Sequence, residues 1–241
     1  MNRAQYDSIA VWYDACVRSE SVPDHFVLSH LLEILGHVRG LYICDLACGQ
    51  GRLARELARR GAHVVGIDLS PRLLAIAQGN EKAEPLGIGY VLDDAQGLHA
   101  VAGEPFDVVV CHMALMDIPD LEATLQAAWR ILCSRGWFAF TITHPCFEAP
   151  HSTWVTRADG STSREIRGYF EQVYWRSKNV AGLRGKVGAY HRTLSTYINT
   201  TIRAGFTIEH MVEPRATGRV VDRIPGYAVV PGFLIVQCRK R

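Results

Sequence analysis

Long apolar runs are missing from this sequence. The longest, residues 227–236, holds about ten residues and contains Pro231 and Gly232, whereas a helix that crosses a bilayer needs about 20 apolar residues. The first twenty residues are interrupted by charge, which leaves no place for the apolar core of a secretory signal. The charged residues are Arg3, Asp7, Asp14, Arg18 and Glu20. We therefore expect no membrane partner and no secretion signal.

Cysteine pairs are missing too. The seven cysteines are odd in number and scattered over positions 16, 44, 48, 111, 133, 146 and 238. None forms a Cys-x-x-Cys pair or the Cys/His spacing of a zinc site. The sequence therefore predicts reduced thiols in a cytoplasmic protein, with no bound metal.

An excess of charge of either sign is also absent. The 26 Lys and Arg residues nearly balance the 24 Asp and Glu residues, which leaves a net charge of +2. A nucleic-acid binder would show basic runs, and the densest one here, residues 239–241, is a chain end. With 241 residues, 48% of them hydrophobic, the chain can bury a core without disulfides. We expect a single domain over 1–241 and no nucleic-acid partner.

A regular alternation of short apolar runs and helical patterns fills the first part of the chain. Apolar runs of this length, bounded by glycine or turn residues, predict strands that are buried on both faces. The expected strands are 41–46, 63–68, 88–92, 106–111 and 136–143, and the expected helices are 24–38, 52–60, one from Ser70 and 120–133. Such an alternation indicates an α/β fold with a doubly wound, mostly parallel sheet.

The alternation breaks after residue 144. Residues 145–189 are rich in Gly, Ser, Arg and aromatic residues and show no clear helical pattern. A helix is expected again at 191–204, followed by strands at 206–212 and 227–238. Because no crossover helix is expected between these two strands, we predict an antiparallel pair at one edge of the sheet.

A glycine-containing loop follows the first expected strand, in the sequence Asp45-Leu-Ala-Cys-Gly49-Gln-Gly51. The two glycines let the backbone come close to a ligand, and the next helix offers free N–H groups. Asp68 ends the second expected strand, seventeen residues past Gly51. In open α/β sheets ligands bind beyond the carboxyl ends of the strands. A carboxylate there can accept both ribose hydroxyls, so we predict an adenosine-type ligand.

Two kinds of adenosine ligand compete for this loop. Residues 49–54 fit the pattern G-x-G-x-x-A, which makes an NAD-dependent oxidoreductase one alternative. Asp45 argues against it, because a carboxylate at the end of the first strand repels a pyrophosphate and attracts a sulfonium or an ammonium. S-adenosylmethionine fits both the adenosine and the positive charge. The other interpretation of Asp45 is a partner for the start of the next helix.

Several motifs together resemble a known family. They are DLACGQG at 45–51, GIDLS at 66–70, LDDA at 92–95, FDVVVCHMALMDIPD at 106–120, AGFTIEHMVEP at 204–214 and PGFLIVQCRK at 231–240. These segments look like class I S-adenosylmethionine-dependent methyltransferases, in the small-molecule branch with ubiquinone-type and natural-product enzymes. The resemblance covers about 40–144 and 190–238. It implies a Rossmann-like, seven-stranded sheet with an antiparallel edge strand.

The resemblance also implies roles near the methionine part of the cofactor. The loop with Ala47, Gly49 and Gly51 would lie along methionine and ribose. Asp45 would act near the methionine amino group, directly or through water. Cys111 would lie beside the methionine part.

Further roles are implied for the adenosine end. Asp68 would hold the ribose hydroxyls, and Leu69 would pack on adenine. Asp94 would accept a hydrogen bond from the adenine amino group, and Ala95 would offer its backbone N–H.

An N-terminal helical cap over residues 1–38 would close over the cofactor. Tyr6 and Tyr13 belong to it, with core packing as the alternative for both rings.

Methyl transfer from a sulfonium needs an acceptor held in line with the S–CH₃ bond in a water-poor pocket. An acceptor O–H, N–H or C–H group also needs a base. The candidates follow the fourth and fifth strands or open the late helix: His112 and Asp117, His144, and His191. The alternative for each histidine is a purely structural role. The alternative for Asp117 is to orient an amine acceptor.

The segment 145–189 is expected to form the acceptor pocket and lid for a small molecule. Its aromatic residues would wall the acceptor, or else belong to a packed β-hairpin, and its arginines would suit an acidic acceptor. The residues are Trp154, Tyr169, Phe170, Tyr174 and Trp175, and Arg164, Arg167, Arg176 and Arg184. O-, N- and C-methylation, a non-catalytic cofactor-binding module, and a monomer or a homodimer all stay open.

Overall fold

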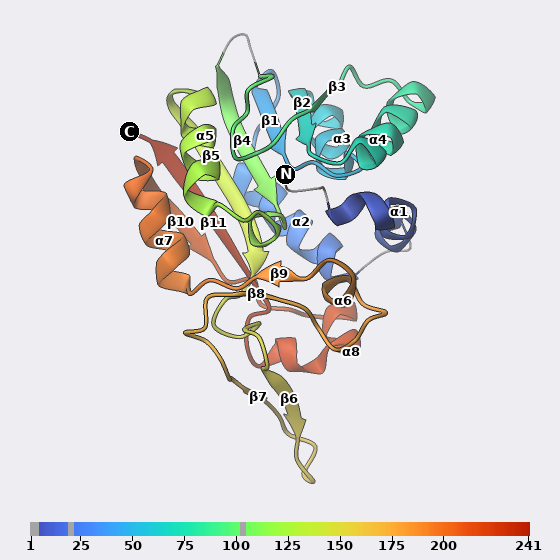
Figure 1. The fold of residues 1–241 in the computed structure, drawn as a ribbon, viewed down its shortest axis with the longest axis vertical. Helices are drawn as coiled ribbons and strands as arrows, with labels where there is room; N and C mark the ends of the chain where they lie inside the picture. Colours follow the sequence, from blue (N-terminus) through green and yellow to red (C-terminus); the bar gives the residue numbers. More distant parts are fainter. Residues whose placement is uncertain (1–4, 19–21, 102–104) are drawn as a thin grey trace.

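A seven-stranded sheet forms the centre of the structure, a computed structural model that describes residues 5–18, 22–101 and 105–241 (Figure 1). Its order is β10-β11-β5-β4-β1-β2-β3, and every neighbouring pair is parallel except the two that involve β11. The strands are β1 Tyr42–Leu46, β2 His63–Asp68, β3 Gly89–Leu92, β4 Phe106–His112, β5 Leu132–Thr143, β10 Phe206–Val212 and β11 Phe233–Lys240. The predicted doubly wound, mostly parallel sheet is confirmed.

Helices cover both faces of this sheet (Figure 1). Alternate side chains of β4 point to opposite faces, as a pleated strand requires. Val108 and Val110 join one core cluster with α2 and α3, whereas Val109 and Cys111 join the other with α5 and α7. The helices are α2 Val22–Leu35, α3 Arg52–Arg59, α4 Pro71–Ala83, α5 Leu121–Ile131 and α7 Leu194–Arg203. In the described part of the chain, no helix is long and apolar enough to cross a membrane.

The expected antiparallel pair at the edge is present, with one detail that the sequence did not indicate. β11 lies between β5 and β10, so the antiparallel strand is one position in from the edge. It begins at Phe233 rather than near 227, because α8 Arg219–Arg223 and η3 Pro225–Ala228 take up the chain before it. Pro231 and Gly232 then separate this helical segment from the strand.

The segment after β5 forms a protruding subregion rather than a pattern-free loop. β6 Thr153–Thr156 and β7 Thr162–Glu165 make an antiparallel hairpin that points away from the main sheet (Figure 1). β8 Tyr174–Trp175 pairs with β9 Ala189–Tyr190, and the short helix α6 Leu183–Val187 lies between them in sequence. This helix was not expected from the sequence.

The expected N-terminal cap over 1–38 is not one unit in the structure, because its helices pack in two different places. Residues 1–4 and 19–21 of this range lie outside the described residues. Only η1 Gln5–Ile9 and α1 Ala10–Arg18 lie against α4, at the carboxyl edge of the sheet. α2 instead buries Val27, Leu31 and Leu35 in the core beneath the sheet. The part that can cover a ligand is therefore residues 5–18.

The loop after β1 is fixed by two glycines with positive φ. Gly49 has φ +57° and Gly51 has φ +82°, a region that favours glycine. Gly51 stands directly before α3, and a Cβ there would overlap Oη of Tyr90. The backbone N–H of Cys48 donates to the carbonyl of Ile67, which ties this loop to the end of β2 (2.9 Å). The glycine at position 51 is therefore required by the close packing of this loop against Tyr90.

Replacing Gly51 tests this construction. Gly51→Ala should lower the free energy of unfolding by about 1–3 kcal/mol, because a side chain is strained at this φ and overlaps Tyr90. Gly79→Ala is the matched control, since Gly79 lies within α4 with open space around it, and alanine there should add up to about 1 kcal/mol. Equal effects in urea unfolding would contradict this interpretation of the loop.

Candidate functional site

A cleft opens at the carboxyl ends of β1, β2, β3 and β4. Its volume is about 940 Å³, counting the open mouth. η1, α1 and the end of α6 contribute the opposite wall through Tyr6, Tyr13 and Val187. Ligands of open α/β sheets bind at this edge, where the strand order reverses. The strand order reverses at β1 in this sheet, since β2 lies on one side of β1 and β4 on the other.

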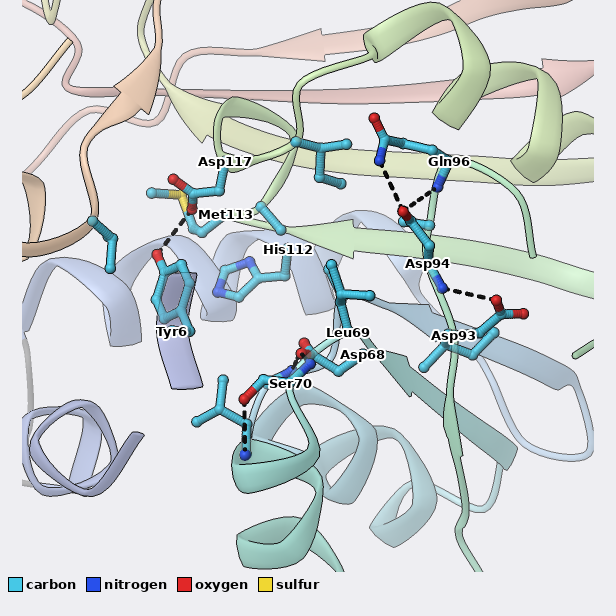
Figure 2. Close-up of a pocket in the computed structure, with 18 of the residues that line it drawn as sticks. Tyr6, Asp68, Leu69, Ser70, Asp93, Asp94, Gln96, His112, Met113 and Asp117 are labelled. Carbon is cyan, nitrogen blue, oxygen red and sulfur yellow. Dashed lines mark hydrogen bonds between the residues drawn. The ribbon is translucent and has the colours of Figure 1, made fainter. Parts of the chain in front are cut away.

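Asp68, the last residue of β2, occupies the middle of the cleft floor (Figure 2). Its carboxylate accepts the backbone N–H of Gly49 and that of Ser70, each at 2.8 Å. Burial raises the pKa of Asp68, although these N–H groups oppose the shift. Leu69 follows with 37% of its surface exposed. The Asp68 carboxylate thus links the loop after β1 to the end of β2. The next residue, Leu69, exposes an apolar side chain to the cleft.

Asp93 and Asp94 follow β3 and have different partners. The Asp93 carboxylate accepts the N–H groups of Asp94 and Ala100, at 2.8 and 2.7 Å, and so braces its own loop. The Asp94 carboxylate accepts the backbone N–H (2.9 Å) and the side-chain amide (3.0 Å) of Gln96 (Figure 2). Ala95 lies beside it in the cleft wall.

The opposite end of the cleft lies beyond β4, where η2 Leu115–Asp117 follows the strand. Tyr6 donates its hydroxyl proton to the Asp117 carboxylate at 2.9 Å (Figure 2), and the ring of Tyr13 stands edge-on to that of Tyr6. Arg184 of α6 forms an ion pair with the other oxygen of Asp117. Burial raises the pKa of Asp117, while Arg184 opposes this. The N-terminal helices and the segment after β5 therefore meet at one carboxylate.

His112, the last residue of β4, lines the cleft with one ring nitrogen, Nδ1, in a hydrogen bond. Thr141 Oγ accepts the backbone N–H of Met113 (2.9 Å) and lies 2.8 Å from Nδ1 of His112. The hydroxyl proton can then go to Nδ1, which leaves the ring proton on Nε2. That nitrogen faces a carboxylate oxygen of Asp24 at 3.3 Å. Nε2 is nevertheless buried without a hydrogen-bond partner among the described residues, so the structure leaves the prediction of His112 as a base untested.

The charge of the cleft has one sign. Four aspartates line it, and no lysine or arginine of the described residues does so. The four are Asp68, Asp93, Asp94 and Asp117. A wall of this kind attracts a positively charged ligand and repels a phosphate.

Asp45 lies behind this wall rather than in it. It is 1% exposed, and its carboxylate accepts the N–H of Ala54 in α3 at 2.9 Å. Burial raises the pKa of Asp45 to about 7; the Ala54 N–H opposes this shift, and the nearby charge of Asp68 adds to it. The Asp45 carboxylate is therefore a hydrogen-bond partner for the first turn of α3, which was the alternative interpretation of this residue. Its charge can act on a ligand only across the cleft floor.

Other residues expected at the site are also outside the cleft lining. Gly51 packs against Tyr90, and Cys111 is fully buried in the core. Ala47, Gly49, Asp68, Leu69, Asp94 and Ala95 do line the cleft, as do Tyr6, Tyr13, His112 and Asp117.

The interpretation of His144 as a base does not fit the structure. The ring is 1% exposed and is absent from the cleft lining. Its Nδ1 accepts the backbone N–H of Cys146 at 3.2 Å, so the proton on Nε2 goes to the Glu213 carboxylate at 2.7 Å. Both nitrogens are used, and His144 ties the loop after β5 to the end of β10. It is a structural histidine.

The aromatic residues expected to wall an acceptor are mostly elsewhere. Trp154 packs on Tyr227, and Phe170 is 85% exposed. Tyr169 accepts the N–H of Leu194, and Tyr174 donates to the Val187 carbonyl. Trp175 lines a second, smaller cavity, and the other four line neither this cavity nor the cleft.

The arginines expected to bind an acidic acceptor are occupied as well. Three of them form ion pairs, with Glu148, Glu165 and Asp117 respectively, and the fourth donates to the Tyr174 hydroxyl. They are Arg164, Arg167, Arg184 and Arg176.

Some residues of the cleft were not predicted. Ser70, Gln96, Met113 and Val187 line it as well. Ser70 and Gln96 directly follow the predicted residues Leu69 and Ala95. Their positions in the sequence could therefore have indicated that they belong to the site. Val187 carries no such signal, because it comes from α6, which folds back over the cleft from a segment without clear periodicity.

Comparison with known proteins gives this geometry a context. Residues 44–140 match the family model described as a methyltransferase domain. A ubiquinone biosynthesis O-methyltransferase from Nitrosomonas europaea is 31% identical over 134 residues, 54% of this chain and 56% of that protein. One of the same name from Azoarcus sp. is 33% identical over 141 residues, 57% of this chain and 60% of that protein. The matched part thus spans little more than half the length of these curated relatives.

A solved structure extends the similarity over nearly the whole fold. An S-adenosylmethionine-dependent methyltransferase from Mesorhizobium loti is 33% identical, with a TM-score of 0.74, and the match covers 88% of this chain and 96% of that one. The chain belongs to the S-adenosylmethionine-dependent methyltransferases.

Proposed function

We propose that this protein transfers a methyl group from S-adenosylmethionine to a small molecule. The observation that carries the proposal is the lining of the cleft, which holds four carboxylates and no lysine or arginine among the described residues. A sulfonium and an ammonium are attracted to such a wall. The pyrophosphate of NAD is repelled by it, so an NAD-dependent oxidoreductase is disfavoured.

The order of the polar groups along the cleft fits the parts of this ligand. Neighbouring strands β3, β2, β1 and β4 place Asp94, Asp68, Gly49 and Asp117 in succession along the sheet edge. Asp94 suits the adenine amino group, and Asp68 suits the ribose hydroxyls. The methionine part then points toward Asp117, Tyr6 and His112, and Asp45 adds negative charge from behind the cleft floor.

S-adenosylmethionine supplies a methyl group that its sulfonium already makes electrophilic. The protein's own contribution is to bind, to orient and to exclude water. Tyr6 and Tyr13 of residues 5–18 cover the cleft from one side, and Val187 of the segment 145–189 covers it from another. We infer that these two parts act as cap and lid. The matched relatives are named O-methyltransferases, which favours a hydroxyl as the acceptor; a cytoplasmic location stays a prediction from cysteine usage.

Removal of the Asp68 carboxylate tests the cofactor site. Asp68→Ala should weaken the binding of S-adenosylhomocysteine by about 1.5–3 kcal/mol, or about 10- to 150-fold, the scale of a lost hydrogen bond to a charged group. Calorimetric titration of the folded variant measures this. With S-adenosylmethionine and a panel of phenols and amines, S-adenosylhomocysteine formation followed by mass spectrometry should fall as well.

Asp159→Ala is the matched control for this experiment. Asp159 lies fully exposed in the turn of the β6–β7 hairpin, away from the cleft, so its loss should change neither quantity. Unchanged affinity in Asp68→Ala would remove this residue from the site. Binding without any methyl transfer by the wild-type protein would instead favour a non-catalytic module.

The buried carboxylate of Asp45 predicts a pH dependence of binding. Its pKa in the free protein is about 7, and a positive ligand favours the ionised form, so this pKa falls when the ligand binds. Binding then releases protons, and affinity should rise as the pH increases through 7, by about tenfold for each unit that the pKa falls.

Asp45→Asn keeps an oxygen for the Ala54 N–H and removes the titration. The comparison is the affinity for S-adenosylmethionine at about pH 6 and about pH 8 in both proteins. Titration of the ligand itself cancels in this comparison. The same pH dependence in both proteins would show that Asp45 does not sense the bound cation.

A further inference from the structure

A second cavity, of about 450 Å³ counting its mouth, lies behind the loop that follows β4. The end of β5, β8, β9 and the start of α7 surround it. Its lining includes the apolar or aromatic side chains of Met116, Trp175, Tyr190 and Tyr197, and the polar ones of Glu148 and His191. The mechanism proposed above uses none of these side chains.

The two cavities share a thin wall. Met116 lines the second cavity, and its neighbour Asp117 lines the first. Arg184 lines the second cavity and forms the ion pair with Asp117. Met116, Asp117 and the ion pair of Asp117 with Arg184 thus lie between the second cavity and the methionine end of the cleft. A cation bound beside Asp117 lowers the cost of opening that pair, because it replaces Arg184 as the counterion.

The positive charges around the second cavity are already engaged. Arg192 is 8% exposed and donates to the backbone carbonyls of Leu115, Ile118 and Pro119, at 2.6 to 3.0 Å. Arg184 serves Asp117 and the carbonyl of Gly188. Among the described lining residues, no cation remains for an anionic acceptor. The cavity is therefore not suited to an anion.

His191 has one ring nitrogen available. Its Nε2 lies 2.8 Å from the carbonyl oxygen of Tyr169, and a carbonyl only accepts, so Nε2 carries the proton. The neutral ring then has a lone pair on Nδ1, which can accept a hydrogen bond. Burial lowers the pKa of His191, and although the Tyr169 carbonyl opposes this, the ring stays neutral near pH 7.

We propose that the second cavity binds the methyl acceptor, an uncharged ring-sized molecule whose O–H or N–H group donates to Nδ1 of His191. This inference rests on the proposed methyl transfer. During transfer the C–S bond breaks with its electron pair left on sulfur, a lone pair of the acceptor atom bonds the methyl carbon, and the acceptor proton passes to Nδ1. The positive charge thereby moves from the sulfonium to the His191 ring, which later loses the proton to water.

Nitrogen NMR of the full chain labelled with ¹⁵N-histidine tests this inference without turnover. In the presence of S-adenosylhomocysteine, phenol should shift the Nδ1 signal of His191, because its hydroxyl donates to that nitrogen. Anisole has the same ring but no donor, and should bind about tenfold more weakly. Benzoate, an anion of similar size, should not bind at this site.

Variants identify the signal and control for structure. His191→Gln keeps a donor for the Tyr169 carbonyl and lacks the acceptor nitrogen, so it should lose the response to phenol and retain its affinity for S-adenosylhomocysteine. His210→Gln changes an exposed residue of β10 and should leave the His191 signal responsive. If His191→Gln does not fold, the comparison of phenol with anisole on the wild-type protein decides alone.

The possible outcomes separate the two proposals. An unshifted His191 signal with S-adenosylhomocysteine bound, or equal binding of phenol, anisole and benzoate, would overturn the acceptor site and leave the proposed function standing. Failure of S-adenosylhomocysteine to bind at all would overturn the proposed function first.

Discussion

Negative charge held out of water at the carboxyl edge of the sheet is the constraint on which the site depends. Burial raises the pKa values of Asp45, Asp68 and Asp117, so keeping them ionised costs free energy in the free protein. Backbone N–H groups offset part of that cost at Asp45 and Asp68, and Arg184 does so at Asp117. A cationic ligand offsets more of it. The buried carboxylates therefore cost free energy in the free protein, and the same carboxylates make the cleft selective for a cationic ligand.

The sequence predicted the sheet and the middle of the site well, because both depend on local patterns. Short apolar runs separated by helical spacing define parallel strands, and the ends of such strands meet at one edge. Asp68 was found in this way, whereas Asp94 came from the resemblance to the methyltransferase family; both line the cleft. Asp45 lies behind the cleft wall, and its position at a strand end does not show that its carboxylate accepts the N–H of Ala54. His144 was misjudged because its partner Glu213 lies 69 residues away.

The segment after β5 could not be predicted from the sequence. It lies outside the matched family segment 44–140, and its short elements depend on contacts with distant parts of the chain. Tyr169, for example, orients His191 through its carbonyl, and Arg184 of α6 meets Asp117 across 67 residues. The sheet edge thus carries what the family shares, while this segment shapes the second cavity. Specificity for the acceptor is expected to reside there.

The measurement that tests the electrostatic account most directly is a calorimetric titration of the wild-type protein with S-adenosylmethionine and, separately, with NAD. Both ligands carry adenosine, and they differ in the charge that meets the carboxylates. The account predicts saturable binding of S-adenosylmethionine, weakened by added salt, and no binding of NAD. Binding of NAD with no heat from S-adenosylmethionine would contradict it.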